Sequence, residues 1–398
     1  MSTVTQTKTS TGTTAAPGNS LANTNGNNFL LFNSDWLKLQ SFITSCMQMP
    51  ITQGDFTTKY GTFSDETLIE NCVNAMKQVQ ALGTIMGDPS SLQKKISSDP
   101  NYVSGKTAPG EIYAHCIWLA GQLNETASTF NMTWSSLSEM YTGSASQNAS
   151  TLKEILTGEG GLQSSAQTML TYTQALQKKL ADFQTNFDTA EKVILTYCDK
   201  DSKVLADAQK DVTVDTSSIS SLQSQASEAH SEWEKYTIAA TTASIGIAVI
   251  SMGILWPVAA GVGGGLGAAA ANEMALYNKL TGEIRSDQVD LQKKTRLVTD
   301  LTSFNLSMAK VSGLLTSFAS ALATIEGVWL DQNQKLTHIA GLDDDTLGDL
   351  PTVMQKLDIL NAQKAWGVIA TNTSKFTTNS LVNYLSNIKY PAPIPAQN

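Results

Sequence analysis

The chain has 398 residues, of which 41% are hydrophobic and 15% are charged, and its formal net charge is -9. This hydrophobic content supports a folded core and excludes a wholly disordered chain. The acidic balance argues against a nucleic-acid partner, because a phosphate backbone requires a basic protein surface.

Residues 1–28 are predicted to form a disordered tail. They contain one lysine and no apolar block, so they do not have the pattern of a cleavable export signal. If the protein leaves its cell, we therefore expect lysis or a dedicated secretion machine. Residues 391–398, PAPIPAQN, are predicted to be an irregular C-terminus.

Apolar residues recur at alternating steps of three and four along most of the chain. This spacing predicts long helices that pack lengthwise at shallow angles. The apolar stripes occupy residues 32–46, 68–86, 113–141, 176–197, 301–329 and 359–376. Their members are aromatic and mixed aliphatic residues, which favours a multi-helix bundle over a two-stranded coiled coil. The sequence therefore predicts an all-α fold, an elongated bundle of about five long helices.

Glycine and proline mark the expected ends of these helices. Gly87 is expected to end the second helix, and residues 88–108 are expected to form a loop. The glycine-rich run 158–161 is expected to interrupt the long helical region, and 341–345 is expected to be another loop. Pro351 then falls at the favoured first turn of the last helix.

The four cysteines and three histidines do not have the spacing of a metal site. Cys46, Cys72 and Cys116 fall on apolar stripes, which predicts buried structural thiols. No nucleophile–base pair is evident either. We therefore expect no metal, no cofactor, no catalytic residue and no enzymatic activity.

One segment, residues 236–272, contains no charged residue. Trp256 and Pro257 divide it into two halves, each close to the length that spans a bilayer as a helix. Aromatic residues favour the membrane interface. They occur here at the start of the uncharged run, Tyr236, and at its dividing point, Trp256. Trp256-Pro257 is expected to form the turn between the two halves.

Three interpretations of this segment compete. Gly263, Gly265 and Ala268 match the glycine pattern of a nucleotide loop, but no strand precedes them and no βαβ unit follows. An ordinary buried core segment is an alternative, although a narrow bundle has little room for both halves. A conditional membrane hairpin fits best, because Thr and Ser dilute the first half and pairs such as Gly261/Gly265 allow close backbone packing in lipid.

Sixteen apolar, aromatic and glycine residues of this segment are predicted to enter the membrane. They are Tyr236, Ile238, Ile245, Ile247, Val249, Ile250, Met252, Ile254, Leu255, Trp256, Pro257, Val258, Val262, Gly263, Gly265 and Leu266.

A long-helix bundle that is interrupted once by an uncharged hairpin resembles the cytolysin A superfamily of α-pore-forming toxins. This superfamily includes the haemolysin BL and non-haemolytic enterotoxin components. The resemblance covers residues 29–390. It rests on the two helical regions that flank the uncharged segment, 162–235 and 273–336, and on the terminal helix that contains Trp366.

The resemblance implies a helical tail domain formed by residues 29–235 and 273–390. It also implies a small hydrophobic head formed by 236–272. In the soluble protein this head would be a β-tongue or a short helical hairpin. The β-branched first half permits strand and the Ala-rich second half favours helix. Of the two forms, we prefer the β-hairpin.

The resemblance also implies a function. The head would detach on meeting a membrane, insert into it and oligomerise, so that a soluble monomer becomes part of a ring. Implied partners are the lipid membrane of a target cell and homologous toxin components, because the Thr and Ser residues offer only a weak polar lining for a pore. The protein would be secreted and would act at the host cell membrane. Alternatives are a type III secretion translocator or tip-like helical protein, and a structural coiled coil that never meets lipid.

Overall fold

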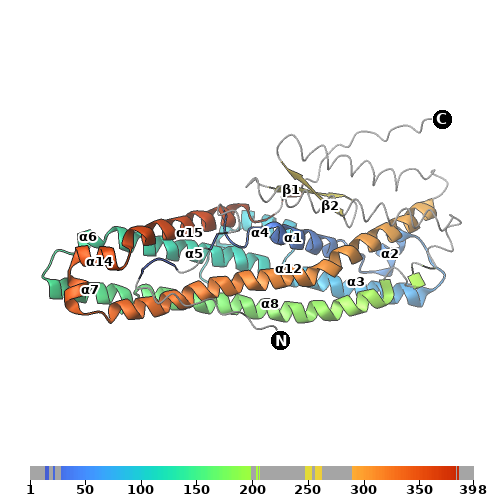
Figure 1. Ribbon diagram of the computed structural model, residues 1–398. Helices are drawn as coiled ribbons and strands as arrows, with labels where there is room; N and C mark the ends of the chain where they lie inside the picture. The colour runs from blue at the N-terminus through green and yellow to red at the C-terminus, as the bar shows by residue number, and fades with distance from the viewer. Residues whose placement is uncertain are drawn as a thin grey trace.

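The computed structural model describes residues 14–17, 21–22, 28–198, 203–204, 206, 247–252, 256–261, 289–381 and 383–384. These residues form an elongated helical bundle with a small β-sheet on its flank (Figure 1). The helices before the sheet are α1 (Ser34–Met47), α2 (Gln53–Tyr60), α3 (Glu66–Met86), α4 (Pro89–Ser98), the 3-10 turn η1 (Pro100–Tyr102), α5 (Ile112–Ser135), α6 (Leu137–Met140), α7 (Ala145–Thr157) and α8 (Leu162–Cys198). The helices after it are α12 (Val289–Ala340), α13 (Asp344–Gly348), α14 (Leu350–Lys356) and α15 (Ile359–Asn379).

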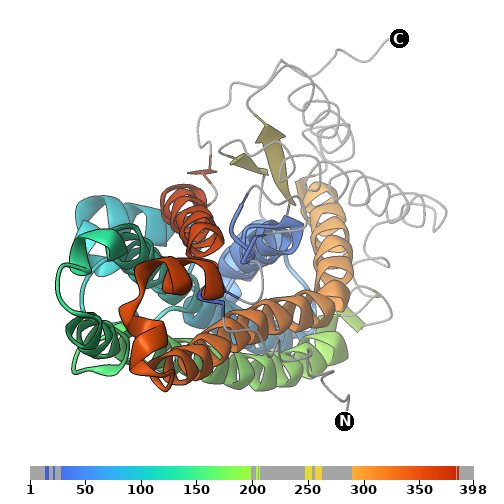
Figure 2. The ribbon, with the colours of Figure 1, turned by 60° about the vertical axis from the view of Figure 1, so that its left-hand side comes forward.

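The two longest described helices run side by side and set the shape of the molecule. α12 has 52 residues, which corresponds to roughly 78 Å of helix, and α8 packs along it (Figures 1 and 2). α3 and α5 also pack against α8, α1 packs against α12, and α15 packs against α5. The predicted elongated bundle is confirmed, and α3, α5, α8, α12 and α15 are its long described helices.

The apolar stripes form the core as predicted. Every stripe position on α12 from Leu301 to Trp329 is buried, and so is every stripe position on α8 from Leu176 to Ile194. Near one end of the bundle the rings of Trp329 and Trp366 stack at 5.6 Å between centroids, and Phe130 packs against Trp366 at 4.6 Å. These contacts join α5, α12 and α15.

Part of α12, Ser307–Ala340, is long and apolar enough to cross a membrane by length and composition alone. The core helix of a soluble bundle meets the same criteria. Its residues from Met308 to Ile339 include the buried stripe that faces α8 and α1. Of this apolar window, 39% is buried inside the bundle.

The four cysteines are buried and free, which confirms the prediction of buried thiols for Cys46, Cys72 and Cys116. Burial raises the pKa of the Cys46 and Cys116 thiols well above the ordinary value. The pKa of Cys198 is also raised. The larger cause is a hydrogen bond with the Cys72 side chain, and the smaller cause is burial. The Cys72 thiol also donates to the carbonyl of Tyr197 at 3.3 Å, which joins α3 to the end of α8.

The region 88–108, expected to be a loop, instead contains α4 and η1, so that prediction is wrong. The Asp88 side chain accepts a hydrogen bond from the backbone N–H of Ser91, and Pro89 occupies the first turn of α4. Proline is compatible with a first turn because the N–H it lacks has no helical partner there. The glycine break before Leu162 is confirmed.

The C-terminal helical region is divided where the sequence predicted one helix. Pro351 lies in the first turn of its helix as expected, but this helix, α14, ends at Lys356. Asp358 then adopts a left-handed conformation with φ +50°, and α15 begins directly after it. A non-glycine residue in this region interrupts helical hydrogen bonding.

Within the N-terminal 28 residues, the described segments differ from a disordered tail because the bundle provides hydrogen-bonding partners for them. The Ala15 N–H donates to the carbonyl of Leu357 at 2.8 Å, next to the break between α14 and α15. Trp366 Nε1 donates to the Ala15 carbonyl at 3.2 Å. Gln332 and Lys335, both on α12, donate to the carbonyl of Ala16.

His115 is a buried ionisable side chain on α5. Neither ring nitrogen has a hydrogen-bond partner among the described residues, and the ring packs edge-on against Trp118 at 5.5 Å. Burial, with a smaller contribution from the positive charge of Lys179 on α8, lowers the pKa of His115 from 6.5 to about 4. The Lys179 ammonium is itself held by the carbonyls of Pro109 and Gly110.

This shift predicts an acid-sensitive bundle. The pKa of His115 in the folded state, about 4, lies below the ordinary 6.5, so the unfolded chain binds the proton more readily. Its contribution to the free energy of unfolding is complete above pH 6.5 and falls as the pH decreases toward 4, by up to about 3 kcal/mol. Urea unfolding of the wild type and His115→Leu over this interval should show a smaller loss in the variant. His338→Gln, at an exposed position, serves as the control, and equal losses in all three proteins would contradict the assignment.

Candidate membrane-insertion site

The uncharged segment forms a β-hairpin over its described residues. β1 (Ile247–Met252) and β2 (Trp256–Gly261) pair antiparallel, with Met252 opposite Trp256 and Ile247 opposite Gly261. The preferred strand interpretation of the head is confirmed for these two stretches, in the second half of the segment as well as in the first.

The predicted turn at Trp256-Pro257 is wrong. Both residues lie in β2, opposite Met252 and Ser251, and the connection between the strands falls in 253–255, outside the described residues. Proline lacks an N–H, so it is tolerated in a sheet where that side of the strand needs no donor. Among the described strands the order is β2-β1-β3, so β2 lies at an edge, where proline is tolerated.

A third strand that sequence reasoning missed completes the sheet. β3 (Asn383–Tyr384) pairs parallel with β1, with Asn383 opposite Ala248 and Tyr384 opposite Val249. The only local signal is the apolar and β-prone run LVNYL that follows α15. Its partner lies more than a hundred residues away in the chain, so local propensity could not reveal the pairing.

The sheet lies against the side of the helical bundle. β2 contacts α1 and β3 contacts α4. Figures 1 and 2 both show the hairpin beside α1, in the half of the bundle that also contains α2 and the first turns of α12. The described hairpin therefore contacts α1 through β2 and pairs with β3, which contacts α4.

The end of α15 is tied to α1 just before β3 begins. Trp36 Nε1 and Gln40 Nε2 donate to the same acceptor, the carbonyl of Ser380, at 2.6 and 2.8 Å. All three residues are buried. We call this arrangement of Trp36, Gln40 and Ser380 the C-terminal anchor.

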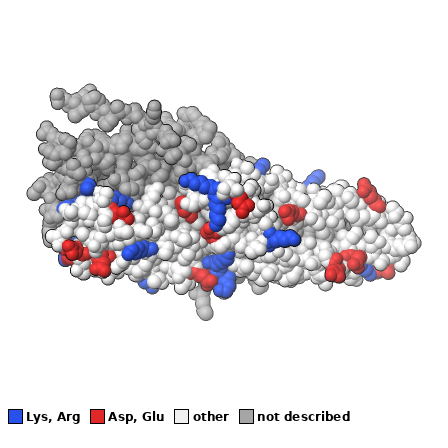
Figure 3. Space-filling model, turned by 180° about the vertical axis from the view of Figure 1, so that it is seen from behind, with Lys and Arg blue, Asp and Glu red and all other residues white. Residues whose placement is uncertain are grey.

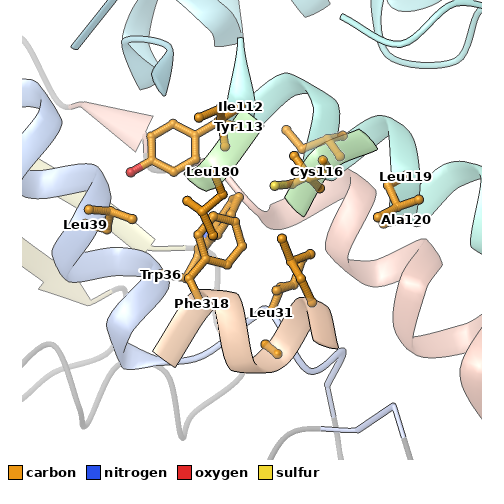
Figure 4. Close-up of a cluster of buried hydrophobic side chains, with 14 of the residues drawn as sticks. Leu31, Trp36, Leu39, Ile112, Tyr113, Cys116, Leu119, Ala120, Leu180 and Phe318 are labelled. Atoms are coloured by element: carbon orange, nitrogen blue, oxygen red, sulfur yellow. The ribbon is translucent and has the colours of Figure 1, made fainter. Parts of the chain in front are cut away.

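Aromatic rings hold the anchor in place. The Trp36 ring makes edge contacts with Tyr113 at 5.0 Å, Phe376 at 5.1 Å and Phe318 at 5.8 Å. Figure 4 shows Trp36, Tyr113 and Phe318 gathered in one buried cluster to which α1, α5 and α12 contribute. Edge contacts of this kind each add to the stabilisation from burial. The anchor therefore belongs to the bundle core.

Charges on the bundle are mixed in sign. Figure 3 shows Lys and Arg interspersed with Asp and Glu on one face. Ion pairs such as Lys95–Glu111 at 3.1 Å and Lys178–Asp182 at 3.2 Å are solvent-exposed and contribute little to stability. Among the described residues, no group of three or more His, Cys, Asp or Glu side chains is placed to hold a metal ion.

The hairpin brings together part of the predicted membrane-insertion set. The members on described strands are Ile247, Val249, Ile250, Met252, Trp256, Pro257 and Val258. The members outside the described residues are Tyr236, Ile238, Ile245, Ile254, Leu255, Val262, Gly263, Gly265 and Leu266.

No protein-family model and no curated protein matches the chain by sequence. Solved structures do match it in fold. The Bacillus cereus HblL1 toxin component superposes with a TM-score of 0.56 at 14% identity, over 92% of this chain and 99% of that one. Soluble SmhA of the tripartite α-pore-forming toxin Smh from Serratia marcescens gives 0.54 at 14% identity, over 89% and 94%. Soluble AhlB of the tripartite toxin AHL from Aeromonas hydrophila gives 0.51 at 10% identity, over 94% and 97%.

The chain therefore has an elongated helical fold shared with soluble components of α-pore-forming toxins. The elongated helical fold that the resemblance implied is therefore confirmed.

The C-terminal anchor predicts a non-additive pair of substitutions. Trp36→Phe removes the indole donor but keeps a ring, and Gln40→Leu removes the amide donor. Each should lower the free energy of unfolding by about 1 kcal/mol, while the double variant should lose more than the sum. The reason is that the buried Ser380 carbonyl then has neither donor. Urea unfolding of the four proteins measures this, and simple additivity would show that the two donors do not share the acceptor.

Proposed function

We propose that this protein is a soluble subunit of a multicomponent α-pore-forming toxin. In this proposal, residues 236–272 insert into the membrane of a target cell, and the protein oligomerises with partner subunits to form a lytic pore. The single observation that carries the proposal is the uncharged β-hairpin on the flank of a bundle with the fold of soluble toxin components.

The chemistry of the segment supports insertion. A charged residue at the centre of a bilayer costs about 3 kcal/mol, and this segment contains none. Apolar burial in lipid favours insertion by about 25 cal/mol per Å². The backbone must stay hydrogen-bonded in lipid, so the strands must convert to helix or join a closed barrel. Along the chain, α8 precedes the hairpin and α12 follows it. Residues 199–246 connect α8 to β1, and residues 262–288 connect β2 to α12.

Partners and location follow from the same proposal. SmhA and AhlB are components of tripartite toxins. By analogy, this chain would be secreted, act at a host cell membrane and assemble with homologous components, with no catalytic step. A type III secretion translocator is less well supported, because a translocator with exposed apolar segments should aggregate when purified alone, whereas a toxin subunit should be a stable soluble monomer.

The proposal predicts that charge in the hairpin abolishes membrane binding. Ile247→Asp should reduce partitioning into phosphatidylcholine–cholesterol vesicles about a hundredfold, because of the cost of burying a carboxylate in lipid. Gly263→Asp should act in the same direction. The matched control is Thr171→Asp, which places the same charge at an exposed position on α8. Vesicle flotation measures binding, and circular dichroism with thermal unfolding establishes that the bundle is intact.

Two outcomes would contradict the proposal. The first is wild-type protein that never associates with vesicles, alone or with the similar-length products of neighbouring genes. The second is an Ile247→Asp variant that binds and permeabilises vesicles as well as Thr171→Asp does.

A further inference from the structure

We propose that β3, Asn383–Tyr384, is an autoinhibitory strap. In the soluble protein the strap would hold the tongue hairpin on the bundle, and β3 would have to separate from β1 before the hairpin can insert. This inference deepens the proposed function, since a strap regulates insertion only if the hairpin inserts.

The first support is the position of β1 in the sheet. β1 is the central strand, paired with β2 on one side and with β3 on the other. An isolated two-stranded hairpin is marginally stable in water, and an unpaired strand edge is open to other chains. β3 covers the edge of β1 at Ala248 and Val249, so it stabilises the hairpin as a sheet in the soluble state.

The second support is the short tether between β3 and the core. Ser380 is held by the two buried hydrogen bonds of the C-terminal anchor, and Leu381 packs against the same core. Asn383 follows three residues after Ser380, and three residues of extended chain reach about 10 Å at most. While the anchor is intact, β3 therefore cannot follow a hairpin that moves out to a membrane. The hairpin can leave only by breaking its pairing with β3.

The third support is the size of this contact. Among the described residues, β3 pairs with β1 at two positions, whereas β1 and β2 pair at six. The described ladder between β1 and β3 is therefore the smaller one, and separation there does not break the six pairs between β1 and β2. The anchor stays buried throughout, so the strap can release the tongue without unfolding the bundle.

A disulfide across the β1–β3 register tests the release step. Val249→Cys with Tyr384→Cys places two thiols at opposed positions. One molecule of oxidised glutathione would oxidise the two thiols to a disulfide and would itself be reduced to two molecules of glutathione. We expect the oxidised double variant to lose release of dye from phosphatidylcholine–cholesterol vesicles, in the presence of its partner subunits, and to regain it with dithiothreitol. The two single variants are the matched controls, because the native cysteines are buried and free.

A pair of truncations tests the restraint without any membrane. Ending the chain after Leu381 removes β3 and keeps the anchor, and ending it after Tyr390 removes only PAPIPAQN. We expect amide hydrogen exchange in 247–252 to become about tenfold faster or more in the shorter protein, the change expected for loss of one or two backbone hydrogen bonds. The longer truncation should match the wild type, and equal thermal unfolding of the two would show that the bundle is intact.

The outcomes separate the two proposals. Unchanged exchange in 247–252 after removal of β3, or undiminished dye release by the verified disulfide, overturns the strap. If no protein, including the wild type, binds vesicles or releases dye, the proposed function is overturned instead. Faster exchange in the shorter truncation would still support β3 as the restraint on the hairpin.

Discussion

The lengthwise contact between α8 and α12 is the constraint on which the rest of the structure depends. Each helix buries a stripe at alternating steps of three and four, a spacing that keeps two helices in register only when they cross at a shallow angle. The contact determines the length of the rod, and α1, α3 and α5 pack onto one or other of these two helices. A bundle built this way is narrow, and its interior is already filled by side chains such as Phe183, Phe187, Phe304 and Trp329.

A filled and narrow interior explains the form of the head. The uncharged segment cannot enter the bundle, and a buried backbone group without a partner is costly. Pairing β1 with β2 supplies hydrogen-bonding partners along the facing edges of the two strands, and Pro257 lies on the outer strand of the described sheet, where proline is tolerated. β3 then pairs with β1 at Ala248 and Val249. The described hairpin is thus held by its own pairing, by β3 and by the contact of β2 with α1.

Trp36 links the head to the bundle through the C-terminal anchor. Its ring contacts residues of α5, α12 and α15, and its indole N–H fixes the last carbonyl before the strap. Two α1 side chains, Trp36 and Gln40, therefore determine where the C-terminal segment leaves the core. The N-terminal segment is held in a comparable way at the other end of α15, where Trp366 donates to Ala15. In both cases a helix bundle uses buried tryptophan donors to position chain that has no helix of its own.

The sequence by itself determined the long helices, because the period of an apolar stripe depends only on local spacing, and the stripes on α5, α8 and α12 are buried as that spacing required. It also located the uncharged segment that forms the hairpin. Local patterns misled where proline was interpreted as a break. Pro89 instead opens α4 behind the Asp88 cap, and Pro257 lies within an edge strand. Only the tertiary structure decided the register of the hairpin, the pairing of β3 with β1 and the anchoring of Ser380, since each joins residues that are remote in the chain or depends on which strand lies at an edge.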